Sequence, residues 1–159
     1  MNISLLERDT FTVCGYCVET SLENCGTDLG QLWRNFETKK QALYEAFGAR
    51  EDFYGLMWKT TGGRYCYLIG IEAADTGKLP FGAVSKSIPP SKYAVASVPS
   101  SQSAVDAWMK FYYEALPGAG YIPNAGHGFD FEYYPHGGQA DYELWTPVIK
   151  KRLIYSVDR

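Results

Sequence analysis

The sequence predicts an α+β domain built from a duplicated βαββ unit, and three features lead to this prediction. Two amphipathic helical segments occur, and each lies between one β-rich segment before it and two after it. Each pair of later segments is joined through a Gly-Gly pair, and the two pairs, 62–63 and 137–138, lie 75 residues apart. A repeated unit explains this order, and its two halves should enclose a ligand groove between antiparallel sheets. We expect one domain over 1–159, with half one at about 8–75, a linker loop at about 76–89 and half two at about 90–150.

In the first half, a β-rich segment at about 10–20 leads into turn and N-cap residues at 24–28. Apolar side chains then recur at steps of three and four residues until Gly48, a typical C-cap residue. This pattern predicts an amphipathic helix that ends at Gly48. Two further strands are expected at about 53–59 and 64–73.

In the second half, a strand is expected at about 93–98, followed by a helix with an apolar stripe that includes Trp108 and Phe111. Pro117 and Gly118 should end this helix. Two more strands are expected at about 129–134 and 141–149.

Composition and charge exclude several classes of function. The chain has 159 residues, 46% of them hydrophobic, and a formal charge of −3. Without a basic surplus it lacks the electrostatic footprint of a nucleic-acid-binding protein. No apolar stretch approaches the roughly 18–20 residues of a membrane span, and the first residues become charged too early for a signal peptide. We therefore expect a cytoplasmic protein that binds neither nucleic acid nor membrane directly.

The cysteines do not predict a metal or redox site. Cys14 and Cys17 have CxxC spacing, but they lie in a β-rich run, where residues three apart point to opposite faces. With only two histidines in the chain, a zinc site lacks ligands. We expect no metal, no cofactor and four reduced thiols, Cys14, Cys17, Cys25 and Cys66.

Aromatic residues are unusually frequent, with 13 Tyr, 8 Phe and 4 Trp making up 16% of the chain. Each buried tyrosine hydroxyl needs a hydrogen-bond partner, so this number exceeds what packing of a core requires. Ligand pockets are lined by such side chains, which combine an apolar face with a polar tip. The aromatic surplus therefore favours small-molecule binding over packing alone.

Carboxylates among these aromatic side chains are candidates for binding a cation. Alternation places Glu143 and Trp145 on one face of the last strand, and Asp130, Glu132 and Tyr134 on one face of the strand before it. In the middle of an apolar strand, Glu143 is paired with a base, faces water or awaits a cationic ligand. Aromatic faces beside a recessed carboxylate would attract a lipophilic cation.

Common catalytic motifs are missing: the sequence has no nucleophile elbow, no phosphate-binding loop and no HExxH zinc motif. Glu132 and Glu143 would form an acid/base pair if both faced one cavity, which the sequence leaves open. His127, in a glycine-rich loop, is a further candidate base.

The chain resembles the GyrI-like small-molecule-binding domains, whose IPxGxYAV signature is similar to Ile88-Pro89-Pro90-Ser91-Lys92-Tyr93-Ala94-Val95. These domains are also the effector-binding domains of AraC- and MerR-type multidrug-sensing regulators. Further matches follow in order at Trp108 with Phe111-Tyr112, at 116–121, at 131–134 and at 142–148.

The resemblance implies a duplicated βαββ fold with a ligand groove between the halves. In the regulators, an acidic residue of the last strand lies in an aromatic pocket and contacts cationic drugs, and Glu143 occupies that position here. Tyr93 matches the signature tyrosine, and Trp33 and Trp108 match helix aromatics that face the groove. No helix-turn-helix region precedes the first strand, so the chain resembles the sensing module alone. The expected ligand-binding residues are Glu143, Trp33, Tyr93, Trp108, Trp145, Phe111 and Tyr67.

Three functions follow from this interpretation. The leading one is a stand-alone module that binds or sequesters lipophilic cationic small molecules, with a separate regulator or DNA-binding protein as a further partner. The alternative is a hydrolase of reactive lipophilic compounds in which Glu143 acts as acid or base, because an aromatic pocket suits a carboxylic acid to that work. The third is a protein-binding inhibitor of the gyrase-inhibitor type.

Overall fold

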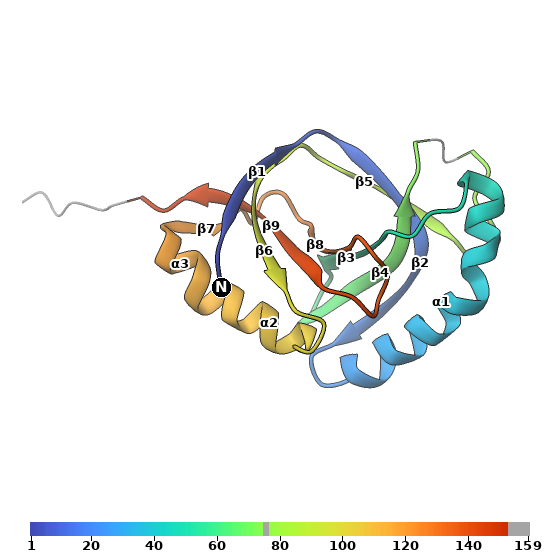
Figure 1. Cartoon of the computed structure of the whole chain (residues 1–159), viewed down its shortest axis with the longest axis horizontal. Coiled ribbons are helices and arrows are strands. Elements are labelled where there is room, and N and C mark those ends of the chain that lie inside the picture. Colours follow the sequence, from blue (N-terminus) through green and yellow to red (C-terminus); the bar gives the residue numbers. More distant parts are fainter. Residues whose placement is uncertain (75–76, 153–159) are drawn as a thin grey trace, which may run out of the picture.

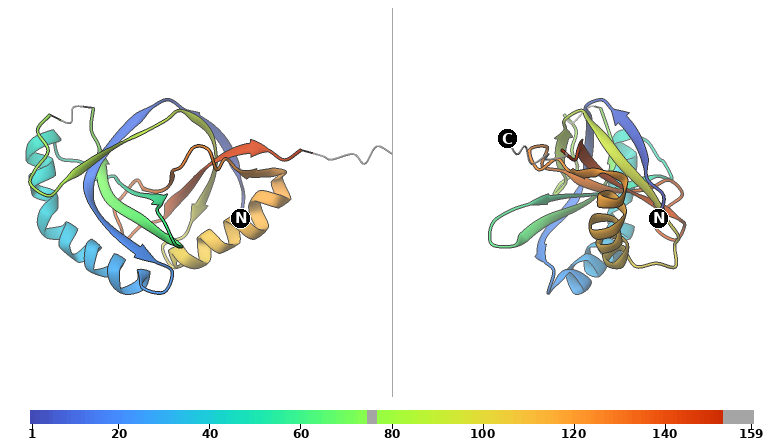
Figure 2. Two further views of the ribbon diagram at one scale, coloured as in Figure 1. Left: turned by 180° about the vertical axis from the view of Figure 1, so that it is seen from behind. Right: turned by 90° about the vertical axis from the view of Figure 1, so that its left-hand side faces the viewer.

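The computed structural model describes residues 1–74 and 77–152, in which the strands form a strongly curved sheet and the helices lie outside it (Figures 1 and 2). No helix of these ranges is long and apolar enough to span a membrane. The helical elements are α1 (Cys25–Phe47) and a continuous second segment of α2 (Ala104–Lys110), the π-helical turn η1 (Phe111–Ala115) and α3 (Leu116–Ala119). The strands are β1 (Ser4–Arg8), β2 (Phe11–Ser21), β3 (Phe53–Lys59), β4 (Arg64–Glu72), β5 (Val84–Ile88), β6 (Ser91–Val98), β7 (Tyr121–Pro123), β8 (Asp130–Tyr134) and β9 (Tyr142–Lys150).

The nine strands confirm the α+β class and the expected antiparallel pairing. Their order is β1-β6-β9-β8-β3-β4-β2-β5, with β7 paired to β9, and every pairing is antiparallel. The central six strands therefore form two groups of three neighbours, β6-β9-β8 and β3-β4-β2. The two sides meet where β3 pairs with β8, in a register that places Gly55 opposite Glu132.

The first helix and hairpin form where the sequence predicts them. Helix α1 buries Leu32, Phe36 and Leu43 and ends at Gly48, which has a φ of 99° and donates its backbone N–H to a carbonyl of the last turn. The turn between β3 and β4 contains Gly62 and Gly63, with φ angles of 67° and 75°. Both values lie in the left-handed region that a two-residue hairpin turn requires, and glycine reaches it without strain.

The linker at 76–89 is not a loop throughout, because it contains strand β5, which pairs with β2. Residues 75 and 76 lie outside the described residues. Strands β1 and β7 were not predicted either. All three strands are short and lie at the edges of the sheet, where half-exposed side chains leave no clear alternation of apolar and polar residues.

The second helical segment does not stop at Pro117. The π-helical turn η1 ends at Ala115, and Pro117 lies in the first turn of α3, which follows η1 directly. The segment ends instead at Gly120, whose φ of 83° is left-handed.

Apolar side chains cover both faces of the sheet. The face toward the helices carries a helix-side core that includes Phe36, Leu43, Phe111, Leu116 and Leu144. The opposite face carries a second core of Phe11, Val13, Tyr54, Leu56, Leu68, Ile88, Tyr93, Val95 and Phe131. Both cysteines of the CxxC pair lie on β2, as expected; Cys14 is buried and Cys17 is exposed, and all four cysteines are free.

Candidate functional site

A glutamate on β8 is the most deeply buried acidic group of the helix-side face. Glu132 is 3% exposed. The hydroxyls of Tyr67 and Tyr134 donate to its Oε1, each at 2.6 Å, and the indole N–H of Trp108 donates to its Oε2 at 2.8 Å. The donors come from β4, β8 and α2, so the carboxyl group joins the two halves of the sheet to the second helix.

A glycine makes room for this arrangement. Gly55 lies opposite Glu132 on the neighbouring strand. A Cβ atom on Gly55 would lie 2.1 Å from the Tyr67 hydroxyl and 3.0 Å from Oε1 of Glu132. Such distances are far below van der Waals contact, so the missing side chain lets the tyrosine hydroxyl reach the carboxyl group.

The surroundings of Glu132 favour its neutral form. Burial raises the pKa of Glu132, and the three hydrogen bonds that it accepts lower it in part. Burial also raises the pKa values of Tyr67 and Tyr134, so both remain neutral donors. Within residues 1–74 and 77–152, no basic side chain donates a hydrogen bond to Glu132, and its charge has no internal counterion.

A second carboxyl group lies two residues away on the same face of β8. Asp130 accepts a hydrogen bond of 2.6 Å from the Tyr112 hydroxyl and another from the Thr146 hydroxyl. Burial raises the pKa of Asp130 as well. The rings of Trp108 and Tyr112 are stacked, with centroids 5.3 Å apart and an interplanar angle of 23°. The stacked side chains of Trp108 and Tyr112 therefore each donate a hydrogen bond to one of the two carboxyl groups.

Aromatic rings from both helices surround Glu132. Trp33 of α1 packs edge-on against Tyr134 at 5.3 Å, and Tyr134 stacks on Tyr142 at 5.0 Å. On the other side, Trp108 contacts Phe111 at 5.7 Å between ring centroids. The sheet and both helices therefore build an aromatic cage around the carboxyl group of Glu132.

The sheet divides the predicted ligand-binding residues into two groups. Trp33, Trp108, Phe111 and Tyr67 lie with the helix-side core, and Tyr67 and Trp108 contact Glu132 directly.

The other three predicted residues lie on the opposite face. Tyr93 is fully buried in the second core, and its ring contacts Trp145 at 5.4 Å. Glu143 is half-buried and accepts a hydrogen bond of 2.9 Å from the indole N–H of Trp145. Glu132 and Glu143 point to opposite sides of the sheet, so they do not form the acid/base pair that a shared cavity would require.

His127 is held by the loop that follows β5. Its Nε2 lies 2.8 Å from the carbonyl oxygen of Pro89 and 3.4 Å from the Tyr93 hydroxyl. These contacts place the imidazole against the second core, away from Glu132. The described ranges contain no group of three side chains that could hold a metal ion.

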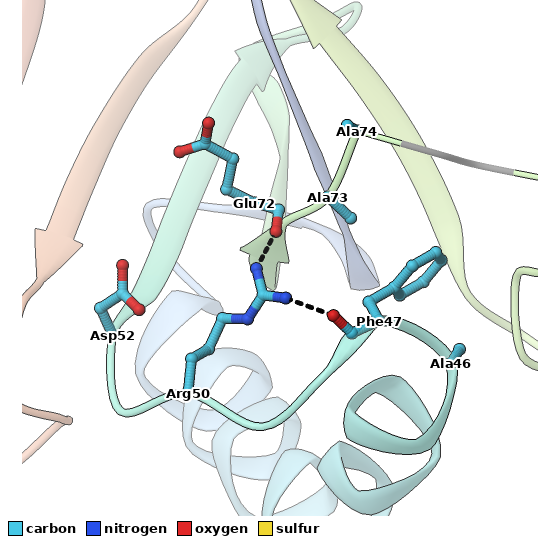
Figure 3. Close-up of a pocket in the computed structure, with 7 residues that line it drawn as sticks. All are labelled: Ala46, Phe47, Arg50, Asp52, Glu72, Ala73 and Ala74. Atoms are coloured by element: carbon cyan, nitrogen blue, oxygen red, sulfur yellow. Dashed lines mark hydrogen bonds between the residues drawn. The ribbon is translucent and has the colours of Figure 1, made fainter.

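An open pocket of about 530 Å³ lies at the C-terminal end of α1 (Figure 3). Arg50 crosses it and donates to the backbone carbonyl of Phe47 at 2.7 Å and to that of Glu72. Its guanidinium is therefore engaged by the backbone. The pocket contains none of the predicted ligand-binding residues and is lined by Ala46, Phe47, Arg50, Asp52, Glu72, Ala73 and Ala74.

A curved antiparallel sheet with two helices on one face and a buried acid among aromatic rings defines an effector-binding domain of the GyrI-like class. The sequence model of Cass2, the integron-associated effector binding proteins, matches residues 4–148, and the chain belongs to this family. The resemblance seen in the sequence is thereby confirmed.

The chain is similar in sequence to a transcriptional regulator. The transcriptional regulator BrlR of Pseudomonas aeruginosa is 28% identical over 155 residues, which cover 93% of this chain and 56% of BrlR. The chain thus spans about half the length of this curated relative.

Solved structures of low sequence identity extend the likeness in fold. The integron cassette protein VCH_CASS2 of Vibrio cholerae superposes with a TM-score of 0.68 at 19% identity, covering 92% of this chain and 95% of that one. SAV2435 bound to tetraphenylphosphonium superposes with a TM-score of 0.74 at 17% identity, covering 94% of each chain. The C-terminal domain of EcmrR superposes with a TM-score of 0.63 at 12% identity, covering 94% of this chain and 98% of that domain.

Proposed function

We propose that this protein binds lipophilic cationic small molecules against Glu132. The observation that carries the proposal is a buried carboxyl group whose hydrogen-bond donors, Tyr67, Tyr134 and Trp108, are all neutral and aromatic. A bound cation would supply the missing positive charge, and the ring faces would add cation–π attraction of up to about 2 kcal/mol per desolvated contact. The fold relative SAV2435 was solved with tetraphenylphosphonium, a cation of this kind.

Glu132 suits this role better than Glu143, the residue that the resemblance selects. Glu143 is half-buried and has one hydrogen-bond donor, the indole of its neighbour Trp145. Solvent screens an exposed carboxylate, so a cation gains less there than at a buried one. Four of the seven predicted residues, Trp33, Trp108, Phe111 and Tyr67, lie on the same face of the sheet as Glu132. Tyr93 and Trp145 would then pack against the opposite face of the sheet.

Ligand entry requires the stacked pair on the second helix to move. Glu132 is 3% exposed, whereas Trp108, which covers its Oε2, is half-buried and adjoins solvent. A cation reaching the carboxylate replaces the indole N–H as its partner. The attraction between the cation and the carboxylate offsets the loss of the indole hydrogen bond. A neutral ligand offers no such attraction, so it should bind weakly.

The strand order supports a duplicated βαββ unit as the origin of the site. The arrangement β6-β9-β8 and β3-β4-β2 is what two copies related by a two-fold axis between β3 and β8 would produce. Glu132 lies beside this axis, where a groove between the halves is expected. The four free thiols fit a reducing, cytoplasmic environment.

A separate regulator or DNA-binding protein is the partner we propose for signalling. The chain matches 56% of the length of BrlR, which is a transcriptional regulator. A second candidate function, hydrolysis, is favoured by the raised pKa of Glu132, since a neutral carboxylic acid can donate a proton to a bound ligand. Recovery of ligand unchanged after prolonged incubation separates binding from turnover.

Titration with tetraphenylphosphonium, followed by tryptophan fluorescence, tests the proposal. Glu132→Gln should weaken binding by about tenfold or more, which corresponds to about 1.4 kcal/mol. Glu143→Gln serves as the matched control and should leave the affinity within about threefold. Triphenylphosphine oxide, a neutral analogue, should bind weakly to all three proteins. Saturable binding that is lost in Glu143→Gln and kept in Glu132→Gln would overturn the assignment of the carboxylate.

A further inference from the structure

Two carboxyl groups, and not one, lie behind the aromatic cover on the second helix. Asp130 and Glu132 are two residues apart on β8 and point to the same face, so the strand rise of about 3.3 Å per residue places their Cα atoms about 7 Å apart. Their hydrogen-bond donors differ completely. Tyr112 and Thr146 hold Asp130, whereas Glu132 has the three donors described above.

The cover is a single structural unit. Trp108 and Tyr112 are four residues apart in the continuous helical segment and their rings are stacked. The indole binds Glu132 and the phenol binds Asp130. A ligand that displaces this stacked pair therefore uncovers both carboxyl groups together.

Among residues 1–74 and 77–152, no ion pair joins a basic side chain to either carboxyl group. Lys59 and His127 act on Asp130 through space, but no basic side chain of the described residues donates a hydrogen bond to Asp130 or Glu132. A ligand with one positive charge would satisfy one carboxylate and leave the other without a counterion. A ligand with two charges at the matching separation would satisfy both.

We propose that this site selects flat, lipophilic dications whose two positive centres lie about 7 Å apart, one against Glu132 and the other against Asp130. This inference rests on the function proposed above and names the class of ligand. The spacing along the strand sets the distance between the charges. The aromatic rings of the cage, with Trp108 and Tyr112, would contact the flat body of the ligand.

Three probes of nearly equal shape separate the contributions of charge. N,N′-dimethyl-4,4′-bipyridinium is a flat dication whose ring nitrogens are about as far apart as the Cα atoms of Asp130 and Glu132. N-methyl-4-phenylpyridinium has the same two rings and one charge, and 4-phenylpyridine is neutral at pH 7.5. Quenching of tryptophan fluorescence at fixed ionic strength measures the affinity of each.

The wild-type protein should bind the dication at least about tenfold more tightly than the monocation. Asp130→Asn should remove most of this preference and change the affinity for the monocation by less than about threefold, whereas Glu132→Gln should weaken both cations. Thr146→Val, which removes a donor to Asp130 but keeps the charge, is the matched control and should retain the preference. Asp130→Ser replaces Asp130→Asn if circular dichroism shows that the latter is unfolded.

Equal affinity for the two cations in the wild-type protein would overturn the inference, as would an equal loss of both in Asp130→Asn. Failure of the proposed function would look different, because neither cation nor tetraphenylphosphonium would then bind. Binding of the monocation without any advantage for the dication would leave the role of Glu132 intact and reject the role of Asp130.

Discussion

The indole N–H of Trp108 donates a 2.8 Å hydrogen bond to Oε2 of Glu132, and this contact links the second helix to the centre of the sheet. Glu132 is paired with Gly55 across the junction of the two half-sheets. One hydrogen bond therefore connects the position of the helix to the ionisation state of the carboxyl group that we propose to bind cations.

Replacing Trp108 with phenylalanine should destabilise the protein. The substitution keeps an aromatic ring but leaves Oε2 of a buried carboxyl group without its donor, which costs about 1–3 kcal/mol. Thermal unfolding followed by circular dichroism measures the change. Tyr113→Phe is the control, because Tyr113 is 73% exposed on the same helical segment and should have no effect. Equal stability of the two variants would show that the indole contact contributes nothing to folding.

The stability of the wild-type protein should fall relative to Glu132→Gln as the pH rises. Burial raises the pKa of Glu132 above its ordinary value of 4.5, so the folded state holds a proton that the unfolded chain releases more easily. This contribution is complete below pH 4.5 and is lost as the pH rises through the raised pKa, at up to about 1.4 kcal/mol per pH unit. Urea unfolding of both proteins at a series of pH values measures the difference, and parallel curves would contradict the prediction.

Binding of a cation should release protons. A positive ligand stabilises the carboxylate of Glu132 and lowers its raised pKa, so the affinity should increase with pH until the pKa of the free protein is passed. Isothermal titration calorimetry in two buffers of different ionisation enthalpy counts the protons released. Glu132→Gln should reduce this number. Proton release that is unchanged in the variant would assign it to another group.

The helices and the long strands could be predicted from the sequence because their apolar periodicity reflects burial. Hairpin β3–β4 lies within one residue of its expected bounds, and helix α1 ends at Gly48 as expected. The helix begins at Cys25, however, inside the segment 24–28 that was expected to hold the turn and the N-cap. Edge strand β5 and the helical path through Pro117 could not be predicted, because each depends on tertiary pairing or on a π-helical turn that has no periodic signal.

The candidate site was only partly predictable for a related reason. Alternation correctly placed Glu132 and Glu143 on particular strand faces, but it does not state which face the helices cover. The helices cover the face of Glu132, and Trp108 donates to it. The sequence does contain a signal in Gly55, whose small size is needed where Tyr67 approaches the carboxyl group, but that signal has meaning only once the strand register is known.

Gly55→Ala should therefore disrupt the site from the centre of the sheet. The added Cβ would lie 2.1 Å from the Tyr67 hydroxyl, so the tyrosine must leave Glu132 or the strands must separate. Overpacking of this kind costs about 1–3 kcal/mol, and a lost donor to the buried carboxyl group adds to it. Gly26→Ala is the matched control, because Gly26 lies in the first turn of α1 with no atom within 4 Å of an added Cβ, and alanine there should be neutral or stabilising by less than about 1 kcal/mol. Urea unfolding and titration with tetraphenylphosphonium should both show a loss in Gly55→Ala and none in Gly26→Ala. If Gly55→Ala kept the stability and the affinity of the wild-type protein, the hydrogen bond from Tyr67 to Glu132 would be shown to contribute to neither.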